Sequence, residues 1–482
     1  MSWEILIIMP HNPGDVVMAL HAADQLKRLL PHANIDLMTG EECVELMGHA
    51  ASLRSILAIP RSALQAKWRS GNPQAAIQAL ENWLKGIEKL HYQLAINFFQ
   101  GPFGAFIQSF IIADKKIGLE LKDGQRFATG SRILEHLFAI PAARGQNPFH
   151  VIDLYRLAAL QALPFPFPTE KSAFKAELAP FSSPFSLDFP PQSYFVFHPG
   201  AAFPGKRWPT SKWAQLATLT LEAGHKIVWT GSHEEKAWME EIAAKIPRID
   251  SENQINKVGE TTWQEAISLY RGAQRVVCGD TAAMHIAAAM GIPVIALFGP
   301  TNPVETGPYG PNHLIIHAQP TLSSDFLLNS ECPQLTKIDP EGLAHLLLTG
   351  QTDGFPPDTL WSTEWDTTHG IQILRDRNDQ IHPFQKQAET WLKLFLSDKL
   401  VLSHPSVTTL GIALKKARES PTSDSLKNLD QAERIHAEET HHQLVWEAYR
   451  VALNGLPVNP LSLHLHLRQD LLARAETEFS IF

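Results

Sequence analysis

Residues 275–311 constrain the fold of this chain more than any other stretch. A short apolar run at 276–278 is typical of a buried strand. Residues 282–290 are strong helix formers, a glycine and a proline end that helix, and a second apolar run follows at 294–298. A strand, a turn, a helix and a second strand at this spacing predict a βαβ unit with a parallel sheet.

The carboxyl edge of this predicted unit is a candidate ligand site. Ligands of open parallel sheets bind outside the carboxyl ends of the strands, and a helix N-terminus there offers free N–H groups that suit phosphate. The residues expected at this edge are Asp280, Thr281, Ala282, His285, Gly299, Pro300 and Thr301. Asp280 is placed to cap the helix. His285 is either a structural residue of the helix or part of a phosphate site, and the sequence leaves both open.

A second βαβ pattern begins the chain. An apolar run at 5–8 predicts the first strand, a helix is expected from about 16 to 30, and the next strand is expected at 35–38. The loop after the first strand carries Asp15. This carboxylate is either a helix N-cap or a general base at the rim of a cleft.

Proline marks a boundary between two domains. A chain of 482 residues is too long for one ordinary core. Prolines gather from residue 163 onward, and because they fix φ and remove backbone donors they indicate a linker. We therefore expect a Rossmann-like domain at 1–165, a linker at 166–192, a second doubly wound domain at 193–349, and a mostly helical extension at 350–482 with a helix at 424–453. Two such α/β halves place a cleft between them.

Composition excludes several other classes of protein. The net charge of -9 gives no reason to expect nucleic acid as a partner, and 44% hydrophobic with 19% charged residues is typical of a soluble globular chain. Cys43, Cys278 and Cys332 are odd in number and far apart, so neither disulfides nor a metal site are expected. The first apolar run is too short for a signal peptide, and no transmembrane helix is expected. These features favour a reducing cytoplasm.

Residues 51–92 are predicted to be helical, amphipathic and locally basic. Arg54, Arg61 and Lys67 are candidate acceptor-binding residues there. Such charges are usually a solvated face, but they could instead meet an anionic substrate or a membrane surface.

The segment 200–206 nearly matches a phosphate-binding P-loop. Arg207 stands where that motif needs a hydroxyl for Mg²⁺, and the following Trp-Pro pair prevents a helix from starting, so a P-loop NTPase is not expected. Lys206 can still neutralise a phosphate, or it belongs to a solvated loop. The absence of G-x-G-x-x-G after the predicted first strands of either half weakens a dinucleotide-dependent oxidoreductase.

Together these motifs resemble glycosyltransferase family 9, the ADP-heptose:lipopolysaccharide heptosyltransferases. The segments that carry the resemblance are 14–17 (GDVV), 198–201 (HPGA), 206–209 (KRWP), 231–235 (GSHEE), 280–285 (DTAAMH) and 298–303 (FGPTNP). They fall in the expected order over about residues 1–349, and the last two are the most specific.

The resemblance implies a GT-B fold, in which two Rossmann-like domains face each other across a cleft. It also implies an inverting, metal-independent transfer without a cofactor. The donor would be a nucleotide-diphosphate sugar such as ADP-heptose, and the acceptor a lipopolysaccharide core or related glycolipid. Such an enzyme would lie in the cytoplasm or on the cytoplasmic face of the inner membrane.

Residue roles follow from the resemblance as well. Asp15 would deprotonate the acceptor hydroxyl, while Lys206 and the helix start at Thr281 and Ala282 would hold the donor diphosphate. Other donor contacts would come from Asp280 and His285 near the sugar and phosphates, Glu234 at the ribose and the backbone near Thr261 at the adenine.

Two other classes of protein remain open. One is a different enzyme on the same architecture, such as a sugar-nucleotide epimerase. The other is a non-catalytic protein that binds a sugar nucleotide or a glycan.

Overall fold

The computed structural model describes most of the first 381 residues. The described residues are 2–381 and 385, apart from 49, 123–125, 129, 140–146, 165–188, 248–250, 319–331, 357 and 367–370. Most of the predicted linker and the helix predicted at 424–453 therefore lie outside the described residues. Within them, no helix is both long enough and apolar enough to cross a membrane.

The first domain is built on a parallel sheet with the strand order β3-β2-β1-β4-β5. Its strands are β1 (Glu4–Ile8), β2 (Asn34–Gly40), β3 (Ser55–Ile59), β4 (His91–Asn97) and β5 (Ile112–Gly118). Alternate residues of β1 enter different cores, because successive side chains of a strand point to opposite faces. Ile5 and Ile7 pack with α1 (Pro13–Leu29) and α7 (Val151–Gln161), whereas Leu6 and Ile8 pack with α4 (Pro73–Ile87) and α5 (Pro102–Phe110).

The remaining elements of this domain are short. They are η1 (Glu41–Cys43), α2 (Val44–Met47), α3 (Arg61–Arg69), α6 (Arg132–Ala139) and the two-stranded β6 (Glu120–Lys122) and β7 (Arg126–Ala128). The prediction of continuous helix at 51–92 needs correction, because residues 55–59 form β3 beside β2. The apolar run of Ile56 to Ile59 satisfies its backbone in the sheet, and the proline that follows starts α3.

The second domain repeats this plan with the strand order β10-β9-β8-β11-β12-β13, all parallel. These strands are β8 (Tyr194–His198), β9 (Lys226–Trp229), β10 (Gln254–Asn256), β11 (Arg275–Gly279), β12 (Val294–Phe298) and β13 (Leu314–His317). The helices are α8 (Thr210–Glu222), α9 (Lys236–Ala243), α10 (Trp263–Gly272), α11 (Ala282–Ala289), α12 (Pro303–Thr306) and α13 (Pro340–Thr349), with single turns η3 (Pro204–Lys206), η4 (His233–Glu235), η5 (Ser251–Asn253) and η6 (Leu335–Lys337). In both sheets the strand order reverses beside the first strand, which is where such folds bind ligands.

Residues beyond 349 contribute strands as well. β14 (Leu360–Asp366) pairs antiparallel with β13, and β15 (Ile371–Arg375) pairs antiparallel with β14. The described part of the predicted helical extension is thus the edge of the second sheet. Neighbouring residues of both strands are buried together, Leu360 with Trp361 in β14 and Ile373 with Leu374 in β15, so this edge is covered on both faces.

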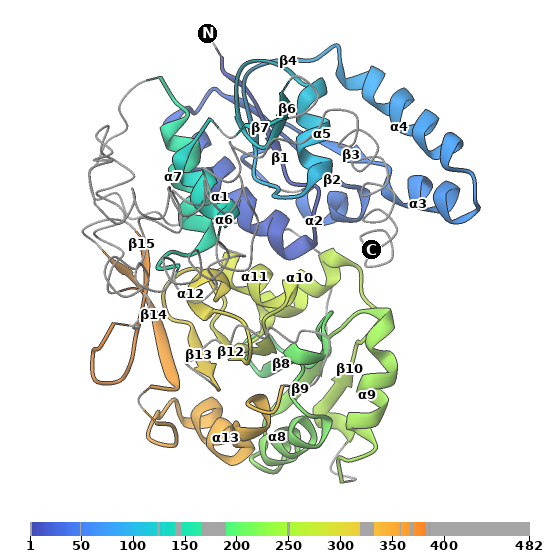
Figure 1. Cartoon of the computed structure of the whole chain (residues 1–482). Helices are drawn as coiled ribbons and strands as arrows, with labels where there is room; N and C mark the ends of the chain where they lie inside the picture. The colour runs from blue at the N-terminus through green and yellow to red at the C-terminus, as the bar shows by residue number, and fades with distance from the viewer. Residues whose placement is uncertain are drawn as a thin grey trace, which may run out of the picture.

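One core joins the two domains. The cluster that contains α1 and α7 also contains α10 and α11, so these helices form the layer between the two sheets (Figure 1). Helices α8 and α13 cover the far face of the second sheet.

A buried hydrogen-bonded network, which we call the tie cluster, also joins the domains. It consists of Gln25, His150, Asp153, Arg156, Tyr309 and Gln372. Arg156 Nη1 lies 3.1 Å from Asp153 Oδ1, and the Gln372 backbone N–H donates to Asp153 Oδ2 at 3.0 Å. His150 Nε2 donates to the Gly307 carbonyl at 2.8 Å. The tie cluster therefore binds α1 and α7 of the first domain to the loop after α12 and to β15 of the second.

Candidate functional site

The N-termini of α1 and α11 meet in direct contact. A Cβ placed on Gly14 would lie 3.0 Å from the His285 ring and 3.5 Å from the Ala282 Cα. Glycine at this position therefore lets the two helices approach closely. This contact brings the loop after β1 and the loop after β11 to the same edge of the molecule.

A cleft of about 700 Å³ opens at that edge, at the carboxyl ends of β1, β8 and β11. Seven of the eleven residues predicted for catalysis and donor binding line it. They are Asp15, Lys206, Thr261, Asp280, Thr281, Ala282 and His285. The two domains contribute together, since Asp15 comes from the first and the others from the second.

Lys206 and Asp280, which both line the cleft, form an ion pair. Lys206 Nζ lies 2.7 Å from Asp280 Oδ2, and the Asp280 side chain is nearly buried. Asp280 is therefore not the helix cap that the sequence predicted. The N-cap of α11 is Thr281, and its side chain makes no capping hydrogen bond.

Two buried polar atoms of the cleft have no hydrogen-bond partner among the residues that the structure describes. They are the Thr281 hydroxyl and Nδ1 of His285. Burial lowers the pKa of His285, although the charges of Asp280 and Asp15 oppose this, so the imidazole is neutral. Buried polar atoms are nearly always paired, and these two have the chemistry to hydrogen-bond a ligand in the cleft.

Asp15 lies in the first turn of α1, where Asn12 rather than Asp15 is the N-cap. Its Oδ2 lies 2.6 Å from Nδ1 of His11. Burial raises the pKa of the Asp15 carboxyl, but the hydrogen bond and charge of His11, with the charges of His285 and Lys206, lower it by more. Asp15 is therefore ionised at neutral pH, as a proton acceptor must be.

The sequence model of "Glycosyltransferase family 9 (heptosyltransferase)" matches residues 83–332, more than half of the chain. The chain belongs to this family. Lipooligosaccharide heptosyltransferase 2 of Haemophilus influenzae is 28% identical over 348 residues, which cover 71% of this chain and 94% of that protein. Lipopolysaccharide heptosyltransferase 1 of Pseudomonas aeruginosa is 28% identical over 332 residues, which cover 67% of this chain and 84% of that protein.

Solved structures show the same fold for this family-9 glycosyltransferase. ADP-heptose lps heptosyltransferase II of E. coli superposes with a TM-score of 0.52 and 21% identity, over 72% of this chain and 98% of that chain. The E. coli heptosyltransferase WaaC with ADP gives a TM-score of 0.54 and 18% identity, over 72% and 100%. The predicted GT-B fold is confirmed.

Some predicted site residues of the family-9 enzyme lie outside the cleft. The Glu234 side chain is exposed, while the neighbouring Glu235 lines the cleft. The predicted loop Gly299, Pro300 and Thr301 does not line it either. A Cβ on Gly299 would lie 2.8 Å from Leu335, which belongs to the core between the second sheet and helices α8 and α13. Gly299 therefore lies on the face of the sheet that is turned away from the first domain.

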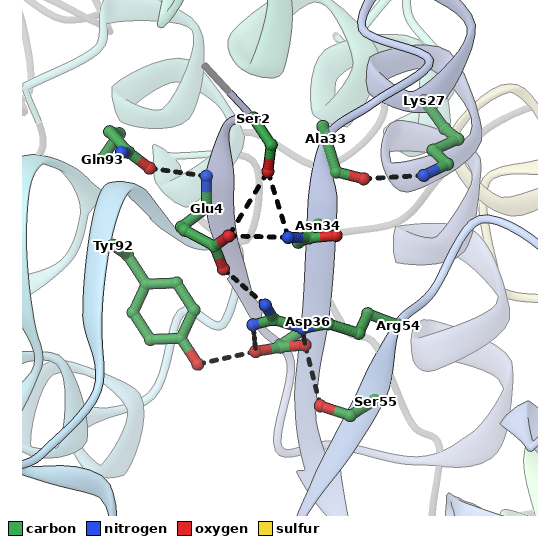
Figure 2. A network of polar contacts seen from close by, with 10 residues as sticks. All are labelled: Ser2, Glu4, Lys27, Ala33, Asn34, Asp36, Arg54, Ser55, Tyr92 and Gln93. Carbon is green, nitrogen blue, oxygen red and sulfur yellow. Dashed lines mark hydrogen bonds and ion pairs between the residues drawn. The ribbon is translucent and has the colours of Figure 1, made fainter.

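The basic residues predicted to bind an acceptor are also outside the cleft. Figure 2 shows the Arg54 guanidinium between Glu4 and Asp36. Arg54 Nη1 and Nη2 lie 2.5 Å from these two carboxylates, and Tyr92 donates a hydrogen bond to Asp36 at 2.9 Å. Arg54 thus balances a buried carboxylate between the strands. Arg61 pairs with Glu42, and Lys67 is exposed on α3.

Three further polar residues, none singled out from the sequence, lie in or beside the cleft. His198 and Glu235 line it, and His11 contacts Asp15 from outside it. His198 Nδ1 lies 3.2 Å from the Thr230 hydroxyl, and its Nε2 lies 3.9 Å from Glu235. Glu235 accepts the Ser232 N–H at 2.7 Å. Gly200 lies so close that a Cβ there would overlap the Glu235 carboxylate, at 2.0 Å. All three lie within or beside the motifs that carry the family resemblance. Their position next to these motifs is the sequence signal that could have identified them.

Proposed function

We propose that this protein is an inverting, metal-independent heptosyltransferase that transfers heptose from ADP-heptose to a lipopolysaccharide core or related glycolipid. The observation that carries the proposal is the arrangement across one cleft. An ionised carboxylate, Asp15, stands on the first domain, and a helix N-terminus with polar atoms that have no partner among the described residues stands on the second. The names of the related proteins supply the sugar and the class of acceptor.

The reaction needs one base and one site that stabilises the leaving group. Asp15 takes the proton of the acceptor hydroxyl as its oxygen attacks the anomeric carbon. The bond from that carbon to the diphosphate oxygen breaks, and the electron pair leaves with ADP. Inversion follows because the base and the leaving group lie on opposite faces of the sugar.

The second domain would hold the donor. Lys206 and the N–H groups at the start of α11 neutralise the diphosphate, and the Thr281 hydroxyl and His285 complete its hydrogen bonds. This charge compensation by the protein is why we propose a metal-independent reaction without a cofactor. We assign the ribose contact to Glu235 instead of Glu234, because the Glu235 carboxylate lines the cleft. The adenine would lie near Thr261. An acceptor anchored in lipid would place the reaction at the cytoplasmic face of the inner membrane.

The test is transfer by the purified protein. ADP-heptose and a heptose-deficient lipopolysaccharide core should give free ADP and an acceptor heavier by one heptose, measured by mass spectrometry. Asp15→Ala should lower the rate by about 10²–10⁴-fold, the usual contribution of a general base, with ADP affinity nearly unchanged. An isomerised donor with an unmodified acceptor would support an epimerase instead. Full transfer by Asp15→Ala would contradict the assigned base.

A further inference from the structure

His11 and Asp15 form a pair beside the cleft. Nδ1 of His11 lies 2.6 Å from Oδ2 of Asp15, and both side chains are about one-third exposed, at 32% and 33%. A carboxylate only accepts hydrogen bonds, so Nδ1 carries the proton and donates. The second oxygen of Asp15 accepts no hydrogen bond from the described residues. One oxygen is thus held, and the other is open to a substrate.

The ring of His11 is itself held in place. It packs against Phe99, which follows β4, with 5.1 Å between the ring centroids. Its backbone carbonyl lies 3.9 Å from the Cys43 thiol of η1. The loop that carries His11 is therefore fixed from two sides, and the imidazole does not line the cleft, whereas Asp15 does.

We propose that His11 is a positioning residue for Asp15: its hydrogen bond to Oδ2 orients the carboxylate. This inference rests on the proposed transfer reaction, in which Asp15 is the base. A carboxylate at the start of a helix can rotate about its side-chain bonds. Fixing one oxygen aims the other at the acceptor hydroxyl, and misplacement of a reacting group by even one ångström slows catalysis strongly.

The titratable groups around Asp15 set the expected pH behaviour. They are His11 on its own loop, His285 on α11 and Lys206 after β8, with Tyr155 on α7 and Cys43 on η1 as further titratable neighbours. Burial raises the pKa of Asp15, and the hydrogen bond and charge of His11 are the strongest opposing influences. Without His11 the pKa of Asp15 rises. Asp15 then becomes a stronger base, but its carboxylate is no longer held in one orientation. We expect the loss of orientation to dominate the effect on kcat.

The experiment compares His11→Ala and His11→Asn with the wild type. In His11→Ala we expect kcat to fall by about tenfold, from the loss of one hydrogen bond to a charged group, with KM for ADP-heptose unchanged. The acid limb of kcat/KM against pH should move to higher pH. In His11→Asn the amide nitrogen takes about the place of Nδ1, so kcat should recover in part.

The matched control is His91→Ala. His91 also pairs with an aspartate, since its Nε2 lies 3.0 Å from Asp114, but this pair is exposed and outside the cleft. Its loss should change neither kcat nor the pH profile. An unchanged kcat and acid limb in His11→Ala would overturn the proposal. So would complete loss of transfer in both His11 variants with Asp15→Ala still active, because His11 would then be the base.

Failure of the proposed function gives a different result. A wild type without any transfer would overturn the heptosyltransferase proposal, but the pair could still be tested by NMR titration of the Asp15 carboxyl. A higher pKa in a folded His11→Ala protein supports the pair, and an unchanged pKa overturns it.

Discussion

Two polar clusters lie between the sheets of this protein, and helix α1 contributes to both. Asp15 near the start of α1 belongs to the cleft, and Gln25, about 15 Å further along the helix, belongs to the tie cluster. The side chains of the tie cluster bond to one another or to nearby backbone. In the cleft, the Thr281 hydroxyl and Nδ1 of His285 have no partner among the described residues.

We infer from this difference that the tie cluster holds the structure and that the cleft groups bind the proposed donor. Paired buried polar groups rigidify a protein, whereas an unpaired one costs stability until something binds it. The tie cluster should therefore matter for folding and little for donor affinity, and the cleft should show the reverse. Four substitutions test this contrast.

Arg156→Met should have the largest effect on stability. Arg156 is buried against Asp153, and removing one partner of a buried ion pair costs about 3–5 kcal/mol. We expect a lower urea midpoint and an unchanged ADP dissociation constant for the folded protein. Lys206→Met is the matched change in the cleft, where the lysine is more exposed. It should cost less stability but weaken ADP binding about 10-fold or more. Equal losses of stability in both variants would remove the contrast.

Acid should weaken the tie cluster through His150. Burial lowers its pKa to about 3, so the unfolded state binds the proton first. The stability that neutral His150 contributes is complete above its ordinary pKa of 6.5 and is lost as the pH falls toward 3. Between pH 7 and pH 5 the free energy of unfolding should fall by about 2 kcal/mol from this cause.

The variant His150→Asn isolates this contribution. Asparagine is a good N-cap and can replace the hydrogen bond that His150 accepts from the Ile152 N–H. Asp153 titrates in the opposite sense, because burial raises its pKa to about 6, but it is present in both proteins. Urea unfolding at pH 7 and pH 5 should show the extra loss in the wild type alone. A parallel loss in His150→Asn would show that other groups cause it.

Thr281→Val should have the smallest effect, with opposite signs for binding and folding. Valine keeps the shape but removes a buried hydroxyl that lacks a partner among the described residues, so stability should stay equal or rise by up to about 1 kcal/mol. ADP affinity should fall by about tenfold, which calorimetry measures. A loss of stability without a loss of affinity would place this hydroxyl among the structural groups.

The residues at the carboxyl ends of the parallel strands could be predicted from sequence, because the patterns that indicate them are local. An apolar run, a turn and a helix former are neighbours in the chain, so the positions of Asp15, Lys206 and Asp280 followed. Glu235 was missed by one residue, since the turn of η4 decides which of two adjacent carboxylates faces inward. The tie cluster had no local signal, because Asp153 meets Gln372 across 219 residues of sequence. The sequence also could not show that Arg54, predicted to bind an acceptor, forms an ion pair with Asp36 on the neighbouring strand.

The most direct test of the account is a crystal structure with a non-transferable ADP-heptose analogue. We predict the diphosphate at the start of α11, within hydrogen-bond distance of the Thr281 hydroxyl and Lys206. The anomeric carbon should face Asp15, with the carboxylate on the side of the sugar opposite ADP. A diphosphate bound away from α11, or Asp15 on the same side as the leaving group, would contradict the account.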